Sequence, residues 1–455
     1  MNRSQIESLR TRLARPESLL TGVAILEKYH QDATPFRTVP DALLLAESVE
    51  DIATAVVFCR DEGIPITPRG AGTGLSGGCI ASPGGLLLSI ERLRDLRILP
   101  EERLAICEPG VITKEVQDAA AAHGLTYPPD PASYEESTLG GNIAENAGGL
   151  RCKRYGVTRD YVVGLEVVLA GGSLLRTGIF NQCRGFSLGE VMVGSEGTLG
   201  LVTRIALRLV PQPGQGATIL VSFGDPADAA EAVAEINTSG LVPTVMEFMD
   251  GDAVACSTEY EPREELKGAA ALLLLETSDR DSEHQAADLK AICARHRCLH
   301  FSMETGSEQA DRLWRVRRNL SKAVKAAAGL RISEDVAVTN SRFPRLVEFV
   351  AEMNRRSRLR INGYGHAGDG NLHVNFMADA DTPENRTEID RWVQVLMRKT
   401  VELGGTLTGE HGIGLAKKAY LTLEFDQPTL GLMRQIKSTF DPGALFNPDK
   451  LFPTL

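Results

Sequence analysis

The stretch Pro68–Gly78 reads PRGAGTGLSGG and places five glycines within nine residues. A short β-rich segment, Ile64–Thr67, precedes it and predicts a strand, and a capping-box pattern predicts a helix over Ser48–Gly63. Glycines adopt the conformations in which successive backbone amides can crowd around an anion. The stretch therefore predicts a cradle for a phosphate-bearing ligand, although a flexible surface turn would share its composition.

Within this loop, Gly72–Gly77 also satisfies the pattern G-x-G-x-x-G, and Glu91 lies 19 residues beyond Gly72. In a Rossmann fold, an acid at about that distance binds the ribose, and a helix follows the glycines directly. The segment Leu75–Gly85 carries four glycines and a proline, so no crossover helix is expected there. The pattern predicts a strand–loop–strand cradle instead.

Further glycine-rich segments follow along the chain. Ser137–Asn142 and Asn146–Gly149 come after a predicted helix over Thr113–Gly124, and Gly194–Gly200 precedes an apolar strand. Between them, Val163–Arg176 reads as a β-hairpin with a Gly-Gly turn. Three separate glycine-rich cradles imply a long, extended ligand that is larger than one phosphate group.

Gly363–Phe376, with the sequence GYGHAGDGNLHVNF, predicts a second hairpin. A turn between the two runs places His366 and His373 on neighbouring strands, where two imidazoles can share a metal ion. Because side chains alternate along a strand, Tyr364 and Asn375 are expected on the same surface as the two histidines.

A second polar segment, Thr408–Gly412, lies 35 residues downstream and offers Glu410 beside His411. Two imidazoles and one carboxylate form a typical metal-ligand set. The sequence therefore predicts a shared site on His366, His373 and Glu410, with His411 left as a base.

The middle of the chain alternates strands and helices in a ferredoxin-like order. The predicted elements are strand Ala217–Phe223, helix Pro226–Asn237, strand Thr244–Phe248, strand Ala270–Thr277, helix Ser282–His296 and strand Leu299–Met303. A basic helix is predicted over Ser307–Ala328.

These motifs, together with the C-terminal Ala444–Lys450, resemble the FAD-linked 2-hydroxy acid dehydrogenases of the vanillyl-alcohol oxidase superfamily. Members include D-lactate dehydrogenase, D-2-hydroxyglutarate dehydrogenase and the flavin subunit of glycolate oxidase. The resemblance implies an α+β protein, with a PCMH-type FAD-binding domain of two subdomains and a ferredoxin-like cap domain. The expected divisions are 1–215, with a core at about 36–213, then 216–420 for the cap, substrate and metal, and 421–455 returning to the FAD domain.

The resemblance implies FAD as the cofactor, bound non-covalently because no histidine lies in the glycine-rich loops. The FAD contacts that it implies are Pro68, Arg69, Gly70, Ala71, Gly72, Thr73, Gly74, Leu75, Ser76, Gly77, Pro129, Asp130, Thr138, Gly141, Asn142, Asn146, Gly148, Glu196, Gly200, Val202 and Asn447.

It also implies a chemistry, the oxidation of a D-2-hydroxy acid of the D-lactate, glycolate or D-2-hydroxyglutarate class. A divalent metal (Zn, Mn or Fe) would be held by His366, His373 and Glu410 and would acidify the substrate hydroxyl. The catalytic residues implied are His411 as the base, Arg317 as the grip on the substrate carboxylate, and Asn375 facing the substrate. The hydride would pass to flavin N5.

Bulk composition narrows the partners and the compartment. The chain has 455 residues and a net charge of -11 without a basic run, which disfavours nucleic acid and anionic membranes. Its longest apolar run, Ala269–Leu275, is far below the ~18 residues that a transmembrane helix needs. The first residues lack the apolar core of a secretion signal. A cytoplasmic protein is expected, and peripheral attachment to the inner membrane stays open.

Eight cysteines without a C-x-x-C spacing argue against an intrinsic iron–sulfur cluster or structural zinc. An external electron acceptor is therefore expected, such as electron-transfer flavoprotein, a quinone or an iron–sulfur subunit. Two alternative functions stay open: a flavin-binding subunit of a multi-subunit oxidase and a metal-dependent hydrolase. The oligomeric state stays open as well, and a homodimer is one candidate. Arg331 and Ser333 stand where relatives often have a lysine, so the size and distal charge of the substrate stay open too.

Overall fold

The computed structural model describes residues 1–81, 84–181, 187–214, 216–278 and 281–453. The chain divides into two compact units. Unit 1 comprises Met1–Gly149, Gly156–Gln212 and Glu410–Leu455, and unit 2 comprises Leu150–Tyr155 and Pro213–Gly409. These bounds differ from the predicted divisions at three places. Unit 2 begins at Pro213 rather than at residue 216, the chain returns to unit 1 at Glu410 rather than at residue 421, and Leu150–Tyr155 belongs to unit 2.

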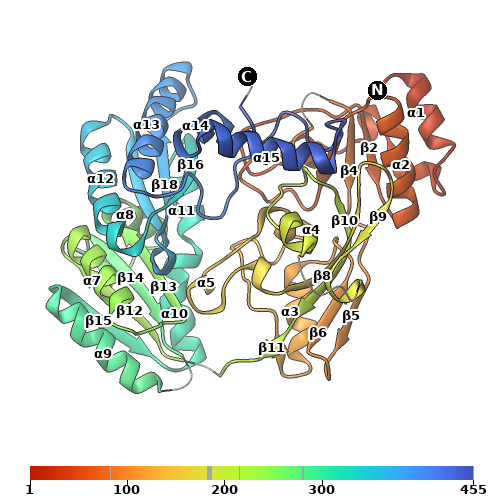
Figure 1. Ribbon diagram of the computed structural model, residues 1–455. Helices are drawn as coiled ribbons and strands as arrows, with labels where there is room; N and C mark the ends of the chain where they lie inside the picture. Colours follow the sequence, from red (N-terminus) through yellow and green to blue (C-terminus); the bar gives the residue numbers. More distant parts are fainter. Residues whose placement is uncertain (82–83, 182–186, 215, 279–280, 454–455) are drawn as a thin grey trace. The chain divides into compact units, whose positions relative to one another are not determined.

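The first part of unit 1 is a four-stranded sheet in the order β1–β2–β4–β3 (Figure 1). Its strands are β1 (Leu19–Leu20), β2 (Ala42–Leu45), β4 (Leu86–Ser89) and β3 (Ile66–Arg69). Strands β2, β4 and β3 run parallel. Among the described residues between β3 and β4 there is no helix, which agrees with the rejection of a Rossmann arrangement.

Helices α1 (Arg3–Arg10) and α2 (Val49–Asp61) pack their apolar side chains on this sheet. The N-cap of α2 is Ser48, whose side chain accepts the Asp51 N–H at 3.1 Å. The capping pattern therefore predicted the start of this helix correctly.

The second part of unit 1 is a five-stranded antiparallel sheet in the order β5–β6–β10–β8–β9. Its strands are β5 (Leu96–Leu99), β6 (Leu104–Cys107), β10 (Leu201–Arg208), β8 (Val162–Val168) and β9 (Leu174–Arg176). Helices α3 (Thr113–Ala121), α4 (Leu139–Glu145) and α6 (Leu188–Met192) join its core. The hairpin of β8 and β9, with Gly172 at a φ of +81° in its turn, confirms the predicted hairpin.

The end of the chain completes the first sheet of unit 1. After α14 (Leu421–Glu424) and α15 (Gln427–Phe440), the backbone runs beside β3. Ile66 donates its N–H to the Leu445 carbonyl at 2.8 Å and accepts the Asn447 N–H at 2.8 Å. Phe446 lies between them and is fully buried in the core that α2 covers. The C-terminal segment is therefore an integral part of unit 1.

Unit 2 is built on one seven-stranded antiparallel sheet in the order β15–β12–β14–β13–β17–β18–β16. Its strands are β12 (Thr218–Phe223), β13 (Val245–Asp250), β14 (Ala271–Glu276), β15 (Cys298–Glu304), β16 (Leu330–Ala337), β17 (Arg360–His366) and β18 (Asn371–Ala378). The first four, with α7 (Pro226–Thr238) and α9 (Ser282–Arg295), have the ferredoxin-like strand order 4-1-3-2, as predicted.

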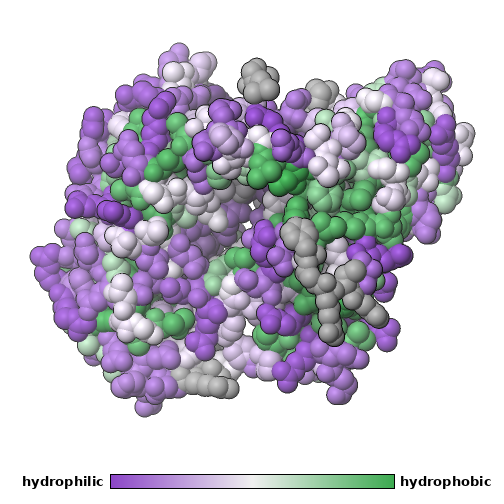
Figure 2. Space-filling model, viewed as in Figure 1, coloured by the Kyte–Doolittle hydropathy of each residue, from purple (hydrophilic) through white to green (hydrophobic). Residues whose placement is uncertain are grey.

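Helices cover both faces of this sheet (Figure 1). On one face lie α7, α9 and α12 (Phe343–Arg356), whose outer surfaces are mostly hydrophilic in Figure 2. On the other lie α8 (Gly251–Tyr260), α10 (Ser307–Arg318) and α11 (Leu320–Ala326). The last two replace the single helix predicted over Ser307–Ala328, because the helix breaks at Asn319. Helix α13 (Pro383–Glu402) packs beside β16.

In the described part of the chain, no helix combines the length and the apolarity that crossing a bilayer requires. Seven cysteines are free thiols, and Cys183 lies outside the described residues.

Candidate functional site

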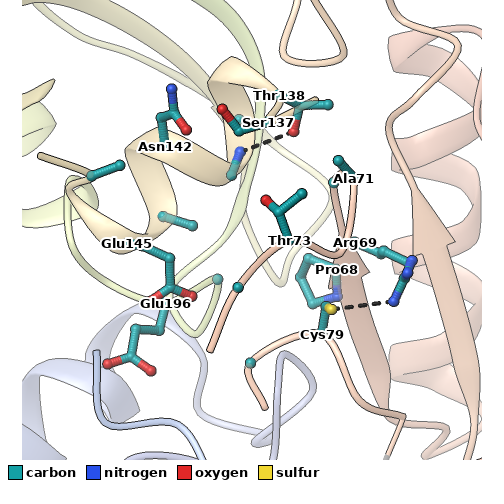
Figure 3. A pocket seen from close by; sticks show the side chains of 18 of the residues that line it. Pro68, Arg69, Ala71, Thr73, Cys79, Ser137, Thr138, Asn142, Glu145 and Glu196 are labelled. Carbon is teal, nitrogen blue, oxygen red and sulfur yellow. Dashed lines mark hydrogen bonds between the residues drawn. The ribbon is translucent and has the colours of Figure 1, made fainter. Parts of the chain in front are cut away.

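A pocket of about 280 Å³ in unit 1 brings the three glycine-rich segments together (Figure 3). The predicted FAD contacts that line it are Pro68, Arg69, Gly70, Ala71, Gly72, Thr73, Gly74, Leu75, Ser76, Thr138, Gly141, Asn142, Gly148, Glu196, Gly200, Val202 and Asn447. Four other predicted contacts, Gly77, Pro129, Asp130 and Asn146, are not among its lining residues.

Residues of this second group shape the wall behind the lining. Asn146 ends α4 in the left-handed conformation, with a φ of 54°, and its Oδ1 accepts the Arg159 N–H at 2.9 Å. The backbone of Asp130 lies so close to Gly149 that a Cβ there would collide with it. Asn146 therefore holds the segment at Arg159, and Asp130 packs closely against Gly149.

Arg69 supports the first glycine-rich loop from beneath. Its guanidinium donates to the carbonyls of Lys28 at 2.7 Å and Gln31 at 2.9 Å, and to Cys79 Sγ at 3.2 Å (Figure 3). Gly72 has a φ of +81°, and a Cβ at this position would collide with the guanidinium. Only glycine therefore fits where the loop passes over Arg69.

The second glycine-rich segment differs from the sequence expectation. Leu139–Glu145 forms helix α4 rather than a loop, with Thr138 as its N-cap accepting the Gly141 N–H at 3.3 Å. Figure 3 shows Ser137 and Thr138 at the start of this helix opposite Ala71 and Thr73. The pair Gly140-Gly141 suggested a loop because glycine disfavours helices, but the N-cap and close packing outweigh that preference.

The glycines of this wall fit a dinucleotide that is held by backbone groups. A Cβ on Gly70 would collide with Thr138 Oγ1, and a Cβ on Gly140 would lie 2.7 Å from Pro109 Cβ. The first close approach brings the loop beside the N-cap of α4, and the second lets α4 pack closely against Pro109. The pocket's shape thus suits an extended, phosphate-bearing cofactor such as FAD.

Sequence reasoning missed several lining residues, among them Asp32, Glu145 and Cys79. Thr138, Asn142 and Glu145 are spaced at helical intervals, so recognising α4 would have placed all three on one face. Glu410 and His411, which were predicted for the metal and the base, also line this unit 1 pocket.

In unit 2, one face of the sheet carries the histidine pair. Tyr364 on β17 is in register with His373 on β18, and their ring centroids lie 5.7 Å apart. The rings of His366 and His373 meet edge to face at 5.3 Å, and a nitrogen of each lies within 4.8 Å of the other. The hairpin geometry and the shared face are therefore as predicted.

A buried glutamate that the sequence reasoning missed organises this face. Glu247 on β13 is in register with His366 and fully buried. Its Oε1 lies 2.5 Å from His366 Nδ1, and its Oε2 accepts the Arg317 Nε–H from α10 at 2.6 Å. Burial alone would raise the pKa of Glu247, but the charges of His366 and Arg317 outweigh it and lower that pKa. Glu247 thus links His366, a candidate metal ligand, to Arg317, the residue expected to bind the substrate carboxylate.

The bond to Glu247 also selects the ring nitrogen that is available for a ligand. With Nδ1 of His366 directed at the carboxylate, Nε2 is the atom that would reach a metal, the usual arrangement at histidine–metal sites. Two imidazoles on rigid neighbouring strands are a suitable donor set for a divalent ion. The signal in the sequence was Glu247 itself, a lone carboxylate in an apolar strand.

Asn375 lies on the same face, but both polar atoms of its side chain already form hydrogen bonds within the protein. Its Nδ2 donates to Asn362 Oδ1 at 2.9 Å, and its Oδ1 accepts the Arg331 Nε–H at 2.8 Å. Arg331 also donates to the Tyr364 hydroxyl at 3.2 Å. Since Asn375 is fully buried, its contact with a substrate stays a prediction.

The chain is anchored just before Glu410. Gly409, the last residue of unit 2, donates its N–H to Asp335 Oδ2 at 2.7 Å, and Thr408 donates to the same carboxylate. Asp335 on β16 is in register with His373. Glu410, the first residue of the returning part of unit 1, follows Gly409 by one peptide bond.

Comparison with protein families matches both halves of the chain. Residues 40–178 match the FAD binding domain, and residues 212–451 match the C-terminal domain of FAD linked oxidases.

Several relatives are similar over nearly their whole length. The glycolate oxidase subunit GlcD of Bacillus subtilis is 37% identical, covering 93% of this chain and 92% of that relative. A D-lactate dehydrogenase of Anaerostipes hadrus is 31% identical over 96% and 95%. A D-2-hydroxyglutarate dehydrogenase of Stutzerimonas stutzeri is 30% identical over 98% of both chains.

Among solved structures, p-cresol methylhydroxylase with substrate bound has a TM-score of 0.79 at 17% identity, covering 98% of this chain and 95% of that one. At this identity the likeness concerns the fold alone, and it confirms the PCMH-type FAD-binding fold that the sequence predicted.

Proposed function

The chain belongs to the FAD-linked oxidases, and we propose that it oxidises a D-2-hydroxy acid to the 2-oxo acid. Three relatives are named for glycolate, D-lactate and D-2-hydroxyglutarate, which are 2-hydroxy acids of different size. The observation that carries the proposal is the face of unit 2 where Glu247 holds both His366 and Arg317. Such a face offers a cation site for the hydroxyl group of a 2-hydroxy acid beside an arginine for its carboxylate.

The glycine-rich pocket of unit 1 would hold FAD non-covalently, and FAD would supply the hydride acceptor at its N5 atom. The loop Pro68–Ser76 would surround the diphosphate with backbone amides, since Arg69 is already committed to supporting that loop.

His366, His373 and Glu410 would hold a divalent zinc, manganese or iron ion, and a bound ion would lower the pKa of the substrate hydroxyl. Two features of the chain support this set. The histidines already face each other on adjacent strands, and Glu410 is tethered one residue beyond the anchored Gly409.

Arg317 would bind the substrate carboxylate. Glu247 fixes its Nε, and its guanidinium carbon lies 5.1 Å from the Tyr364 ring centroid, so the plane of the fork is set before a substrate arrives. A planar guanidinium can bind a carboxylate with two parallel hydrogen bonds, which a lysine cannot do.

His411 would take the hydroxyl proton on an imidazole nitrogen. It follows Glu410 directly and lines the pocket in which the flavin would lie. A base at this position would act on the hydroxyl of the carbon that loses hydride.

The test is anaerobic bleaching of the bound flavin, titrated with D-lactate, glycolate, D-2-hydroxyglutarate and L-lactate, with and without a chelator. One D-acid or glycolate should bleach the flavin, and the chelator should prevent it. His411→Ala should retain FAD, and its flavin should be reduced about 10²- to 10⁴-fold more slowly. His300→Ala, at an exposed histidine, should behave as wild type. A flavin that none of the four acids bleaches would refute the proposed substrate class, and normal reduction in His411→Ala would refute the role of the base.

A second function is favoured by the relative named as a subunit of glycolate oxidase. The chain would then be the flavin-binding subunit of a multi-subunit enzyme and pass electrons to an iron–sulfur subunit. A quinone or electron-transfer flavoprotein would serve a self-contained dehydrogenase instead. Purified chain that is bleached by substrate but reoxidised only by an added partner fraction would support the subunit role. The metal-dependent hydrolase has no support from the family match.

A further inference from the structure

A buried glutamate in unit 1 fastens the segment that carries Glu410 and His411. Glu196 is 6% exposed and has a left-handed backbone, with a φ of 51°. Its Oε1 accepts the Ile413 N–H at 2.7 Å, and its Oε2 accepts the Gly414 N–H at 2.7 Å. One carboxylate thus holds two successive amides of the segment directly after His411.

The fit around this contact is close. A Cβ on Gly412, which has a φ of +90°, would collide with the Glu145 carboxylate and lie 3.0 Å from Glu196 Oε1. Glycine is required at 412 for its backbone conformation and for space. The segment therefore passes between two carboxylates that both line the flavin pocket.

The next residues of the segment are fastened to the first glycine-rich loop. Leu415 and Ala416 donate their N–H groups to the Ser76 carbonyl at 2.8 and 3.1 Å. A Cβ on Gly414 would collide with that same carbonyl. The loop that would bind the cofactor and the segment that would carry the base are thus one hydrogen-bonded assembly.

The backbone of Glu196 is itself held. Asn447 Nδ2 donates to the Glu196 carbonyl at 2.8 Å and to the Gly78 carbonyl at 3.0 Å, and Lys450 Nζ donates to Asn447 Oδ1 at 2.9 Å. Asn447, like Glu196, has a left-handed backbone. The glutamate is therefore a fixed support, and its carboxylate has little freedom to move.

We propose that Glu196 is a positioning residue that sets the place of His411 and Glu410 by binding the amides of Ile413 and Gly414. The family resemblance implied Glu196 as a contact of FAD, but its carboxylate binds the amides of the segment 413–414. A small misplacement of a reacting group costs about 10²-fold in rate. The role of His411 as the base rests on the proposed function.

Two substitutions separate this role from simple packing. Glu196→Gln keeps the size of the side chain, but its amide oxygen can accept only one of the two N–H groups while its NH₂ faces the other. Glu196→Asp keeps the charge and shortens the reach by one methylene. The matched control is Glu166→Gln on β8, which removes the charge that pairs with Arg176 on β9, in the same unit but outside the segment 410–417.

The experiment combines hydrogen exchange of the peptide that contains 410–417 with anaerobic flavin reduction in the holoenzyme. Glu196→Gln should keep its FAD, exchange the Ile413 and Gly414 amides at least ~10-fold faster, and reduce its flavin about 10²-fold more slowly with KM nearly unchanged. Glu196→Asp should fall between Gln and wild type, and Glu166→Gln should match wild type in both measurements.

The outcomes distinguish the inference from the proposed function. Wild-type exchange in Glu196→Gln, or loss of FAD without faster exchange, would overturn the inference in favour of a packing or cofactor-contact role. If Glu196→Gln does not fold, normal exchange and reduction in Glu196→Asp would overturn it equally. Faster exchange in Glu196→Gln while the wild type is bleached by no 2-hydroxy acid would support the fastening of the segment and refute the substrate class.

Discussion

Unit 1 and unit 2 build their functional surfaces from different chemical groups. In unit 1 the wall consists largely of backbone, and glycines permit the close approaches between the loop after β3 and α4. In unit 2 the surface consists of side chains on strands and on α10, and Glu247 holds both His366 and Arg317 by direct hydrogen bonds. A backbone surface is damaged by adding an atom, whereas a side-chain surface is damaged by removing one. Each kind of change should therefore disable only one of the two functions.

Removing a histidine from the unit 2 surface should have the largest effect on activity. His373→Ala deletes one of the two imidazoles that would hold the metal, and activity should fall by about 10³-fold or more. The purified variant should keep its flavin spectrum and lose its metal by elemental analysis. If the variant lost flavin and kept metal, the assignment of the two functions to the two units would be reversed.

Adding a methyl group to the unit 1 wall should have the next largest effect. Gly70→Ala places a Cβ against Thr138 Oγ1, and the strain should weaken FAD binding by about 10- to 10²-fold. Fluorescence titration of the apoprotein with FAD measures this, with metal content unchanged. Gly171→Ala is the control, because its Cβ would meet only Ser173 Oγ at 4.0 Å. Equal FAD affinity in the two variants would contradict the close approach at Gly70.

A subtler change on the unit 2 side is Glu247→Gln. The amide removes the charge that orients His366 and Arg317, and metal affinity should fall by about 10- to 10²-fold with a raised KM. Competition with a metal indicator and steady-state kinetics provide the two readouts. Glu276→Gln, on the neighbouring strand β14, removes a partner of Arg151 and should leave both unchanged. Wild-type metal affinity in Glu247→Gln would show that Glu247 does not support the histidine.

The smallest effect on activity is expected from Asp250→Asn, which changes the stability of the fold and its pH dependence. Burial raises the pKa of Asp250 to about 7, against hydrogen bonds from the Ala253 and Gly363 amides that lower it. For an acid with a raised folded-state pKa, the stabilisation is complete below the unfolded-state value of 3.8 and is lost as the pH rises through about 7.

Wild type should therefore lose stability relative to Asp250→Asn between pH 4 and 7, by on the order of 4 kcal/mol at most. Denaturant unfolding at several pH values measures this difference, and Asp381→Asn, at an exposed aspartate, is the control. Parallel stability curves for wild type and Asp250→Asn would show that burial does not raise the pKa of this group.

The sequence predicted the elements whose signals are local. The cap at Ser48, the hairpin with Gly172 and the alternation along Gly363–Phe376 each follow from short-range rules, and the structure has all three. The ferredoxin-like order follows from the succession of elements. Helix α4 was missed because two glycines stand in its first turns, and its N-cap and close packing outweigh their preference.

The contacts that join distant parts of the chain could not be derived in the same way. Nothing in the local sequence ties Glu196 to Ile413, and Glu247 is separated from His366 by 119 residues. A carboxylate in an apolar strand signals a buried partner, but the identity of that partner depends on strand order and register. The metal set thus came from the predicted hairpin and the polar segment at 408–412, the FAD and substrate residues came from the family resemblance, and the supporting carboxylates came from the structure.

The discontinuity of unit 1 bears on how the protein is made. Ile66 in β3 pairs with Leu445 and Asn447, and Phe446 fills the core beneath α2, so the first sheet is incomplete until the last 46 residues, 410–455, have been synthesised. Unit 2, apart from Leu150–Tyr155, is one continuous stretch that leaves the ribosome earlier. At about 5–20 residues per second, the later-encoded unit 2 can begin to fold before the earlier-encoded unit 1 is complete. The cofactor pocket would then form after unit 2, and nascent chains would acquire FAD only once residues 410–455 have left the ribosome.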